Sequence, residues 1–160
     1  MKSLLSNPWL ELATRFVAGT IFIAASIEKA ADPAAFTTLI ENYKILSPQL
    51  SLLVASTLPW VELVCGFAIL FGWGVRGGAL VLGLLTVGFT AAVISGVLRG
   101  LDISCGCYTL DPDVGRIGWR KVVENTGLLV LFLFLVYSTG TRYTLEAWLS
   151  SRTGKEGAVN

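Results

Sequence analysis

The sequence contains no histidine, and only 14% of its residues are charged. The missing histidine excludes haem–histidine ligation, di-iron sites built on Glu-x-x-His and acid–base catalysis by imidazole in this chain. An average soluble domain has about 25% charged and about 45–50% apolar residues, whereas the apolar share here is 54%. The net charge of +1 and the lack of a basic tract argue against nucleic-acid binding. This composition is typical of a chain whose solvent is lipid hydrocarbon.

The sequence also predicts neither a disulfide scaffold nor a cleavable signal peptide. The chain has only three cysteines, too few to staple a small secreted domain. Its first apolar run contains Glu11 and Arg15, and no clear small-residue cleavage site follows it. We therefore expect the first hydrophobic segment to be retained as a helix.

Four segments are long enough to cross about 30 Å of hydrocarbon as helices. They are residues 9–31, 48–72, 75–98 and 119–139. The predicted fold is all-α: an integral membrane four-helix bundle that forms a single domain over residues 1–148. The polar tail at 149–160 is rich in small residues and is expected to be disordered.

A shorter helix is predicted between the first two spans. Asp32 and Pro33 are residue types that start helices, and Ser47 with Pro48 marks the end of the segment. Its apolar residues share one face: Phe36, Leu39, Ile40 and Tyr43. We expect a short amphipathic helix that lies in the membrane interface.

Polar and small residues follow one helical face in each of the first two spans. These faces consist of Glu11, Arg15, Gly19, Phe22, Ser26 and Lys29 in the first span and of Ser51, Ala55, Pro59, Glu62 and Gly66 in the second. Because a charge that faces lipid costs a few kcal/mol, both faces are predicted to point into the bundle. We predict an intramembrane polar pair between Arg15 and Glu62. It is either purely structural or part of a pocket for a headgroup or quinone.

Further polar residues gather at the end of the bundle that carries two of the cysteines. We predict that four of them line a cavity under the cysteine loop, unless they simply lie among lipid headgroups: Glu28, Lys29, Lys121 and Asn125. Glu124 lies in the same region.

Cys105 and Cys107 stand on either side of a glycine in the longest connection, residues 99–118. A disulfide between them closes a small ring, and the intervening glycine relieves backbone strain. Strained disulfides are easily reduced and tend to be catalytic. We therefore predict that this pair is the catalytic site of thiol–disulfide exchange, exposed at the membrane surface to a partner's thiolate.

Three other interpretations of the pair stay open at this point. In the first, the pair is a static structural disulfide. In the second, the two cysteines are incidental thiols, and in the third they are half of a metal site. A metal needs further soft ligands, and the chain offers only Cys65 and carboxylates, so we predict no metal. Cys65 lies within the second span and is predicted to be a buried thiol.

The orientation of the chain is decided by chemistry and not by charge. Lysine and arginine are divided almost equally between the two sides. A cysteine pair that works with disulfides belongs outside the reducing cytosol. We therefore expect cytoplasmic termini and an extracytoplasmic cysteine loop in a bacterial or archaeal cytoplasmic (inner) membrane.

Four short motifs carry a family resemblance. They are RFVAG at 15–19, EKAADP at 28–33, PWVELVCG at 59–66 and GLDISCGC at 100–107. In these motifs and their order, over about residues 9–140, the sequence resembles the DoxX-like superfamily, and within it the MauE type of methylamine-utilisation membrane proteins. Tyr108 departs from the phenylalanine that usually follows the second cysteine.

The resemblance implies a four-helix membrane bundle that takes part in extracytoplasmic thiol–disulfide chemistry beside a thioredoxin-like protein. Some relatives in the superfamily are linked to thiosulfate oxidation with quinone as the electron acceptor, and MauE-type proteins are linked to disulfide formation in a partner enzyme. The predicted function is thus a membrane redox protein whose Cys105–Cys107 pair exchanges disulfides with a thioredoxin-like partner. Quinone is its candidate cofactor, and no cofactor is bound covalently. The alternative is a non-catalytic assembly or accessory subunit of a larger membrane complex.

Overall fold

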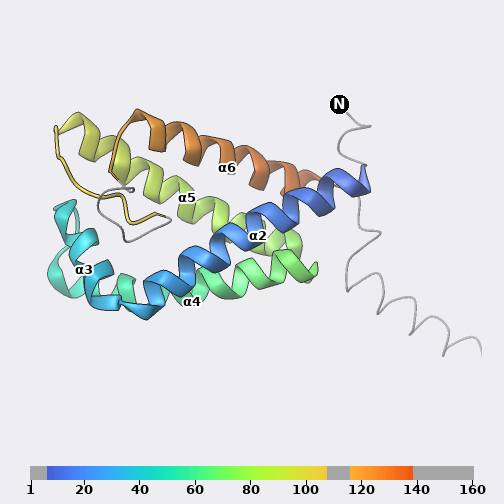
Figure 1. Cartoon of the computed structure of the whole chain (residues 1–160), viewed down its shortest axis with the longest axis horizontal. Helices are drawn as coiled ribbons and strands as arrows, with labels where there is room; N and C mark the ends of the chain where they lie inside the picture. The colour runs from blue at the N-terminus through green and yellow to red at the C-terminus, as the bar shows by residue number, and fades with distance from the viewer. Residues whose placement is uncertain (1–6, 108–115, 139–160) are drawn as a thin grey trace, which may run out of the picture.

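The computed structural model of the protein describes residues 7–107 and 116–138, which fold into five helices (Figure 1). The helices are α2 (Pro8–Ala31), α3 (Pro33–Asn42), α4 (Pro48–Phe71), α5 (Val75–Leu98) and α6 (Trp119–Tyr137). Within the described ranges there is no strand, only an isolated antiparallel bridge between Ser104 and Arg116. The all-α prediction is confirmed for this part of the chain. The tail predicted to be disordered, 149–160, lies outside the described residues.

Three of the helices are long and apolar enough to cross a membrane. These are α2, α4 and α5, each of 24 residues, and they correspond to the first three predicted spans. The chain is therefore a multi-pass membrane protein. The fourth predicted span corresponds to α6, which has 19 residues and carries Arg120, Lys121 and Glu124 near its start. A crossing by α6 stays a prediction.

Local sequence signals set the helix boundaries. The side chain of Asp32 accepts a hydrogen bond from the Ala35 amide at 2.9 Å, and Pro33 occupies the first turn of α3. Proline also opens α4 at Pro48, where its missing N–H costs nothing. Gly72 ends α4 with a φ of 76°, a left-handed conformation that suits glycine.

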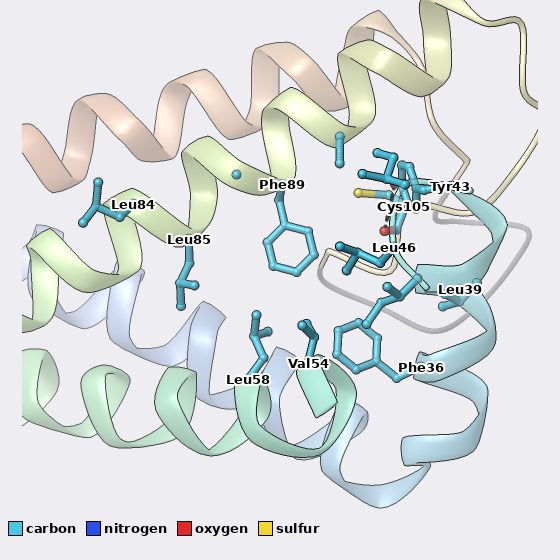
Figure 2. Close-up of a pocket in the computed structure, with 14 residues that line it drawn as sticks. Phe36, Leu39, Tyr43, Leu46, Val54, Leu58, Leu84, Leu85, Phe89 and Cys105 are labelled. Carbon is cyan, nitrogen blue, oxygen red and sulfur yellow. Dashed lines mark hydrogen bonds between the residues drawn. The ribbon is translucent and has the colours of Figure 1, made fainter. Parts of the chain in front are cut away.

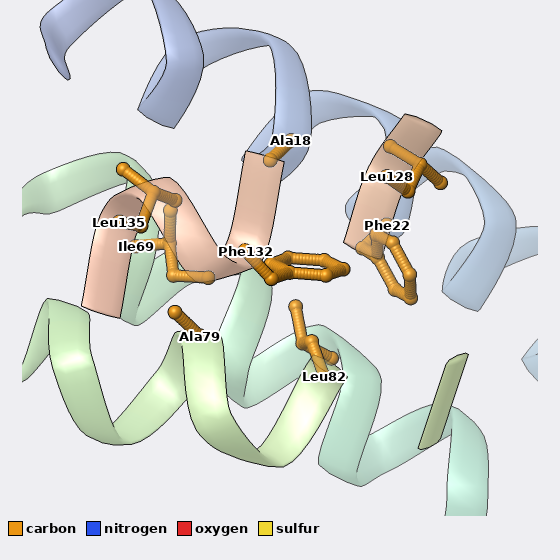
Figure 3. Packing of buried hydrophobic residues seen from close by; sticks show 8 residues of the cluster. All are labelled: Ala18, Phe22, Ile69, Ala79, Leu82, Leu128, Phe132 and Leu135. Atoms are coloured by element: carbon orange, nitrogen blue, oxygen red, sulfur yellow. The ribbon is translucent and has the colours of Figure 1, made fainter. Parts of the chain in front are cut away.

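The four long helices form two closely packed pairs, α2 with α4 and α5 with α6, which lie against each other (Figure 1). Between the pairs lies an apolar core of Ala18, Phe22, Ile69, Ala79, Leu82, Leu128, Phe132 and Leu135 (Figure 3). All residues of the two predicted polar faces are buried. Within the first pair, a Cβ atom added at Gly19 would lie 3.1 Å from the Gly66 carbonyl oxygen, so the two backbones are in contact.

The short helix α3 lies at the same end of the bundle as the loop that follows α5, far from the start of α2 (Figure 1). Its apolar face is turned inward. Phe36 is only 1% exposed and Tyr43, at the end of the helix, is 5% exposed. α3 therefore covers one end of the bundle, and the cysteine loop lies beneath it.

Candidate functional site

A disulfide joins Cys105 and Cys107, whose Cα atoms are 5.2 Å apart. Gly106 between them has a φ of 64°, a conformation that costs other residues roughly 1–2 kcal/mol. A Cβ atom at this position would also lie 3.2 Å from the Leu39 Cδ1 atom and 3.6 Å from the Phe36 ring. Glycine is therefore required both by the turn and by the close approach of α3.

Both cysteines are buried, in contrast to the prediction of an exposed pair. Cys105 is 2% exposed and Cys107 is 7% exposed. The cover is α3, and Tyr43 at its end donates a hydrogen bond to the Cys105 carbonyl oxygen at 3.1 Å. Its hydroxyl is protonated at neutral pH, and burial raises the pKa of Tyr43 further, to about 12. Arg99 in turn donates to the Tyr43 carbonyl oxygen.

Hydrogen bonds and an ion pair join the two described ends of the cysteine loop. The Ile117 amide donates to the Ile103 carbonyl oxygen at 2.9 Å, beside the Ser104–Arg116 bridge. Arg116 also forms an exposed ion pair with Asp102 at 3.7 Å. The loop therefore leaves and re-enters the bundle at one place. Residues 108–115 lie outside the described part of the chain.

An apolar groove runs between α4 and α5 and ends at Cys105 (Figure 2). Its volume is about 290 Å³. The wall residues include Phe36, Tyr43, Val54, Leu58, Leu85 and Phe89. Leu84 at the far end is 70% exposed, so the groove opens onto the outer surface of helices that are suited to lipid. A flat or chain-like apolar molecule in the membrane could enter it and approach the disulfide.

Glu62 pairs with Lys29 and not with Arg15, so the predicted polar pair is wrong. The Lys29 Nζ atom lies 2.8 and 3.1 Å from the two Glu62 carboxylate oxygens, and both side chains are 1% exposed. The reason lies in side-chain direction. Side chains on a helix lean toward its N-terminus, which turns Lys29 into the bundle toward Glu62. The same lean turns Arg15 away from it.

Arg15 instead closes the C-terminal end of α4. Its Nε atom donates to the Ile69 carbonyl oxygen at 2.9 Å, and its Nη2 atom donates to the Leu70 carbonyl oxygen at 3.4 Å. The last carbonyls of a helix lack partners within the helix and carry its partial negative charge. Gly72 marks the C-terminal end of α4 in the sequence and therefore locates these carbonyls. The role of Arg15 was not predicted from this signal.

A second, much smaller cavity, of about 10 Å³, lies beside Cys107. It is lined by Phe22, Glu62, Thr86, Phe89, Cys107 and Asn125. Of the predicted cavity residues, Asn125 belongs to this lining and Lys29 is linked to it through Glu62. Lys121 pairs instead with Glu124 at 2.9 Å, and Glu28 is half-buried outside the lining.

Cys65 is a free cysteine on α4, half-buried against the apolar core. Part of its surface is therefore exposed, although a buried thiol was predicted. The neighbouring Gly66 and Ile69 are buried, which places Cys65 at the edge of the face that packs into the bundle. The disulfide thus leaves one thiol in the chain, within a helix suited to span the membrane.

These features define a small multi-pass membrane protein with a disulfide held against one end of its helices. The family model for the methylamine utilisation protein MauE matches residues 7–138. The chain therefore belongs to the MauE family.

Two curated relatives carry the same family name. The methylamine utilization protein MauE of Methylophilus methylotrophus is 29% identical over 136 residues, 84% of this chain and 72% of the relative. The protein of that name from Paracoccus denitrificans is 28% identical over 151 residues, 94% of this chain and 80% of the relative. No solved structure matches the chain.

Proposed function

We propose that this chain is a membrane thiol–disulfide redox protein of methylamine utilisation. Its Cys105–Cys107 pair exchanges disulfides with a thioredoxin-like partner, and a membrane quinone accepts the electrons. The observation that carries the proposal is the position of the disulfide, whose Cys105 lies at the end of an apolar groove. The names of both curated relatives support the link to methylamine utilisation.

The proposed cycle balances with two electrons. A partner dithiol gives two electrons and two protons to the Cys105–Cys107 disulfide and becomes a disulfide itself. The reduced pair then passes two electrons and two protons to quinone, which leaves as quinol. The oxidised partner finally transfers its disulfide to an enzyme whose maturation requires one.

A non-catalytic accessory role is the second candidate, and burial of the disulfide favours it. Both cysteines are buried, and the whole chain has only one further cysteine. Membrane disulfide oxidases generally relay electrons through a second cysteine pair. In this role the disulfide fixes the loop against α3 and the chain serves the assembly of a larger membrane complex.

Alkylation of intact membranes across a glutathione redox series distinguishes the two functions. A redox function predicts that Cys105 and Cys107 change together from alkylated to protected within the series. It also predicts that Cys107→Ser traps a mixed disulfide between Cys105 and a thioredoxin-like protein. Cys65→Ser is the matched control and should change neither result. A pair that stays oxidised throughout and traps nothing would leave the accessory role.

The quinone step has a separate test in the groove. A Cβ atom at Gly88, which lines the groove, meets nothing within 4 Å. We expect Gly88→Leu to fill the groove and slow reoxidation of the reduced pair by added quinone in membranes. Gly77→Leu is the control, because Gly77 is equally open and lies on the same helix outside the groove lining. Equal reoxidation in both variants would remove quinone from the proposal.

The proposed topology has α6 as the fourth span, cytoplasmic termini and an extracytoplasmic cysteine loop. Reporter fusions after Gly74 and after Asp111 should then be found on opposite sides of the membrane, with the second one outside. Fusions on the same side would contradict the span count, whereas a reversed pair would contradict only the orientation.

A further inference from the structure

The two cysteines of the disulfide face different surroundings. Cys105 lines the apolar groove, which is open at its far end. Cys107 lines the small cavity, whose other walls include Glu62, Thr86 and Asn125. A volume of about 10 Å³ is at the lower limit for a single water molecule. This cavity therefore accommodates no substrate, but a proton can move within it.

The acid in this cavity is held by a single buried cation. Lys29 bonds both carboxylate oxygens of Glu62, and its Nζ atom lies 5.3 Å from the ring centroids of Phe36 and Phe89. Glu28 also acts electrostatically on Lys29. The helices α5 and α6 contribute the uncharged Thr86 and Asn125 to the cavity. In the described part of its lining, Glu62 and Cys107 are thus the groups that can exchange a proton.

We propose that Glu62 is the proton acceptor for the Cys107 thiol when the disulfide closes, and that Lys29 is the residue that positions it. This inference rests on the proposed redox function. A partner thiolate opens the disulfide at Cys105, which lines the groove, and Cys107 is released as a thiol. Attack of Cys107 on the mixed disulfide is the reverse of this step and closes the disulfide again.

The step is balanced in atoms and electrons. The Cys107 S–H bond breaks and its proton passes to the Glu62 carboxylate. The Cys107 sulfur uses its electron pair to form a bond to the Cys105 sulfur, and the bond from Cys105 to the partner breaks. The partner leaves as a thiolate, and Glu62 returns the proton to solvent, from which the thiolate recovers it. In the proposed cycle the partner gives electrons to the disulfide, so the same step runs in reverse and Glu62 gives its proton to the Cys107 sulfur. A thiolate has no favourable solvation in an apolar interior, so a carboxylate that takes the proton at the moment of attack lowers the barrier.

The test uses the full chain with Cys65→Ser, reduced in lipid nanodiscs and mixed with glutathione disulfide. Samples are quenched with acid at successive times. Mass spectrometry then measures the mixed disulfide of Cys105 as it forms and as it is replaced by the Cys105–Cys107 disulfide. We expect Glu62→Gln to slow closure at least about a hundredfold at neutral pH, which is the lower end of the usual contribution of a general base. Glu124→Gln is the matched control and should leave closure unchanged.

Two further variants separate proton transfer from structure. Glu62→Asp keeps the charge opposite Lys29 while withdrawing the carboxylate by one methylene, so closure should be slowed less than in Glu62→Gln. Lys29→Met should shift the pH at which closure reaches half its maximal rate, because it removes the cation beside the acceptor. Thermal unfolding of each variant shows whether it is folded, and Glu62→Asp answers the question if Glu62→Gln does not fold.

The results that contradict this inference differ from those that contradict the redox function. If the mixed disulfide forms and closes equally fast in the unmodified chain, in Glu62→Asp and in Glu62→Gln, the proposed role of Glu62 is wrong, but the redox function is not contradicted. A Cys105 that forms no mixed disulfide with glutathione, and none with a thioredoxin-like protein in the Cys107→Ser chain, would overturn the redox function, and this inference with it.

Discussion

At one end of the bundle Gly19 and Gly66 bring α2 and α4 into backbone contact, and Arg15 donates to the carbonyls that end α4. At the other end the same two helices are bridged by the side chains of Lys29 and Glu62. We call these ends the glycine end and the cysteine end. Both bury charge, and the cysteine end also has the groove that ends at Cys105, the disulfide and the small cavity.

The comparison shows how one helix pair can be rigid at one end and adapted to chemistry at the other. Glycines allow backbones to approach closely, and close contact between helices is what holds membrane bundles together. At the cysteine end, longer side chains take up the space between helices and bring polar groups into it. The glycine end therefore fixes the position of α2 against α4, and this position sets where Lys29 meets Glu62.

The largest expected effect is at the buried ion pair. Glu62→Leu leaves Lys29 with an uncompensated charge, and breaking such a pair typically costs about 3–5 kcal/mol. Adding Lys29→Met to Glu62→Leu removes both charges and should recover most of the loss. The free energy of unfolding in detergent measures each variant. If the losses of the two single variants simply add, the residues do not interact.

Much of this arrangement was predictable from residues close together in the sequence, but the pairing was not. The polar faces of α2 and α4 follow from helical periodicity, and the starts of α3 and α4 follow from Asp32, Pro33 and Pro48. Periodicity gives the helix face on which Glu62 lies, but not which residue of the neighbouring helix stands at the same height along the bundle. This alignment depends on the contact between Gly19 and Gly66.

The burial of the disulfide was unpredictable for a related reason. Leu39 and Phe36 on α3 pack over Gly106, from a helix distant in the sequence. The amphipathic pattern of α3 predicts an apolar face, and both lipid and a folded loop can cover such a face equally well. Only the path of the chain between α5 and α6 decides between them.

The second prediction tests the glycine end. Gly19→Ala places a methyl group 3.1 Å from both the Gly66 carbonyl oxygen and the Leu70 Cβ atom, and such overpacking costs about 1–3 kcal/mol. Gly77→Ala is the control, because nothing lies within 4 Å of the added atom. It should stabilise the helix slightly, by about 0.4–1 kcal/mol. A Gly19→Ala protein as stable as the Gly77→Ala protein would contradict backbone contact between α2 and α4.

The third prediction concerns the turn of the disulfide. Gly106→Ala must adopt a φ near 64° against Leu39, which should cost about 1–2 kcal/mol. Because the disulfide depends on this turn, the variant should also hold a smaller oxidised fraction at a given glutathione ratio. Gly100→Ala is a useful comparison: Gly100 also has a positive φ, of 66°, but nothing lies within 4 Å of an added Cβ atom. It should lower stability without lowering the oxidised fraction.

The smallest effect is expected at Tyr43, whose hydroxyl donates to the Cys105 carbonyl oxygen. Tyr43→Phe removes one buried hydrogen bond, worth about 0.5–1.5 kcal/mol at neutral pH. The pH dependence carries more information than this loss. In the folded protein the pKa of Tyr43 is raised from 10.0 to about 12, so the protonated form is favoured by folding.

The contribution of this protonated hydroxyl is fully present below pH 10, where the unfolded chain is also protonated, and it is lost as the pH rises from there toward about 12. The Tyr43→Phe protein lacks this titration. Thermal unfolding of both proteins should therefore show the unmodified chain as the more stable one at pH 7, and the difference should narrow above pH 10. Parallel unfolding curves across that range would mean that the hydroxyl is exposed to water, and that α3 does not cover the cysteine loop in the membrane.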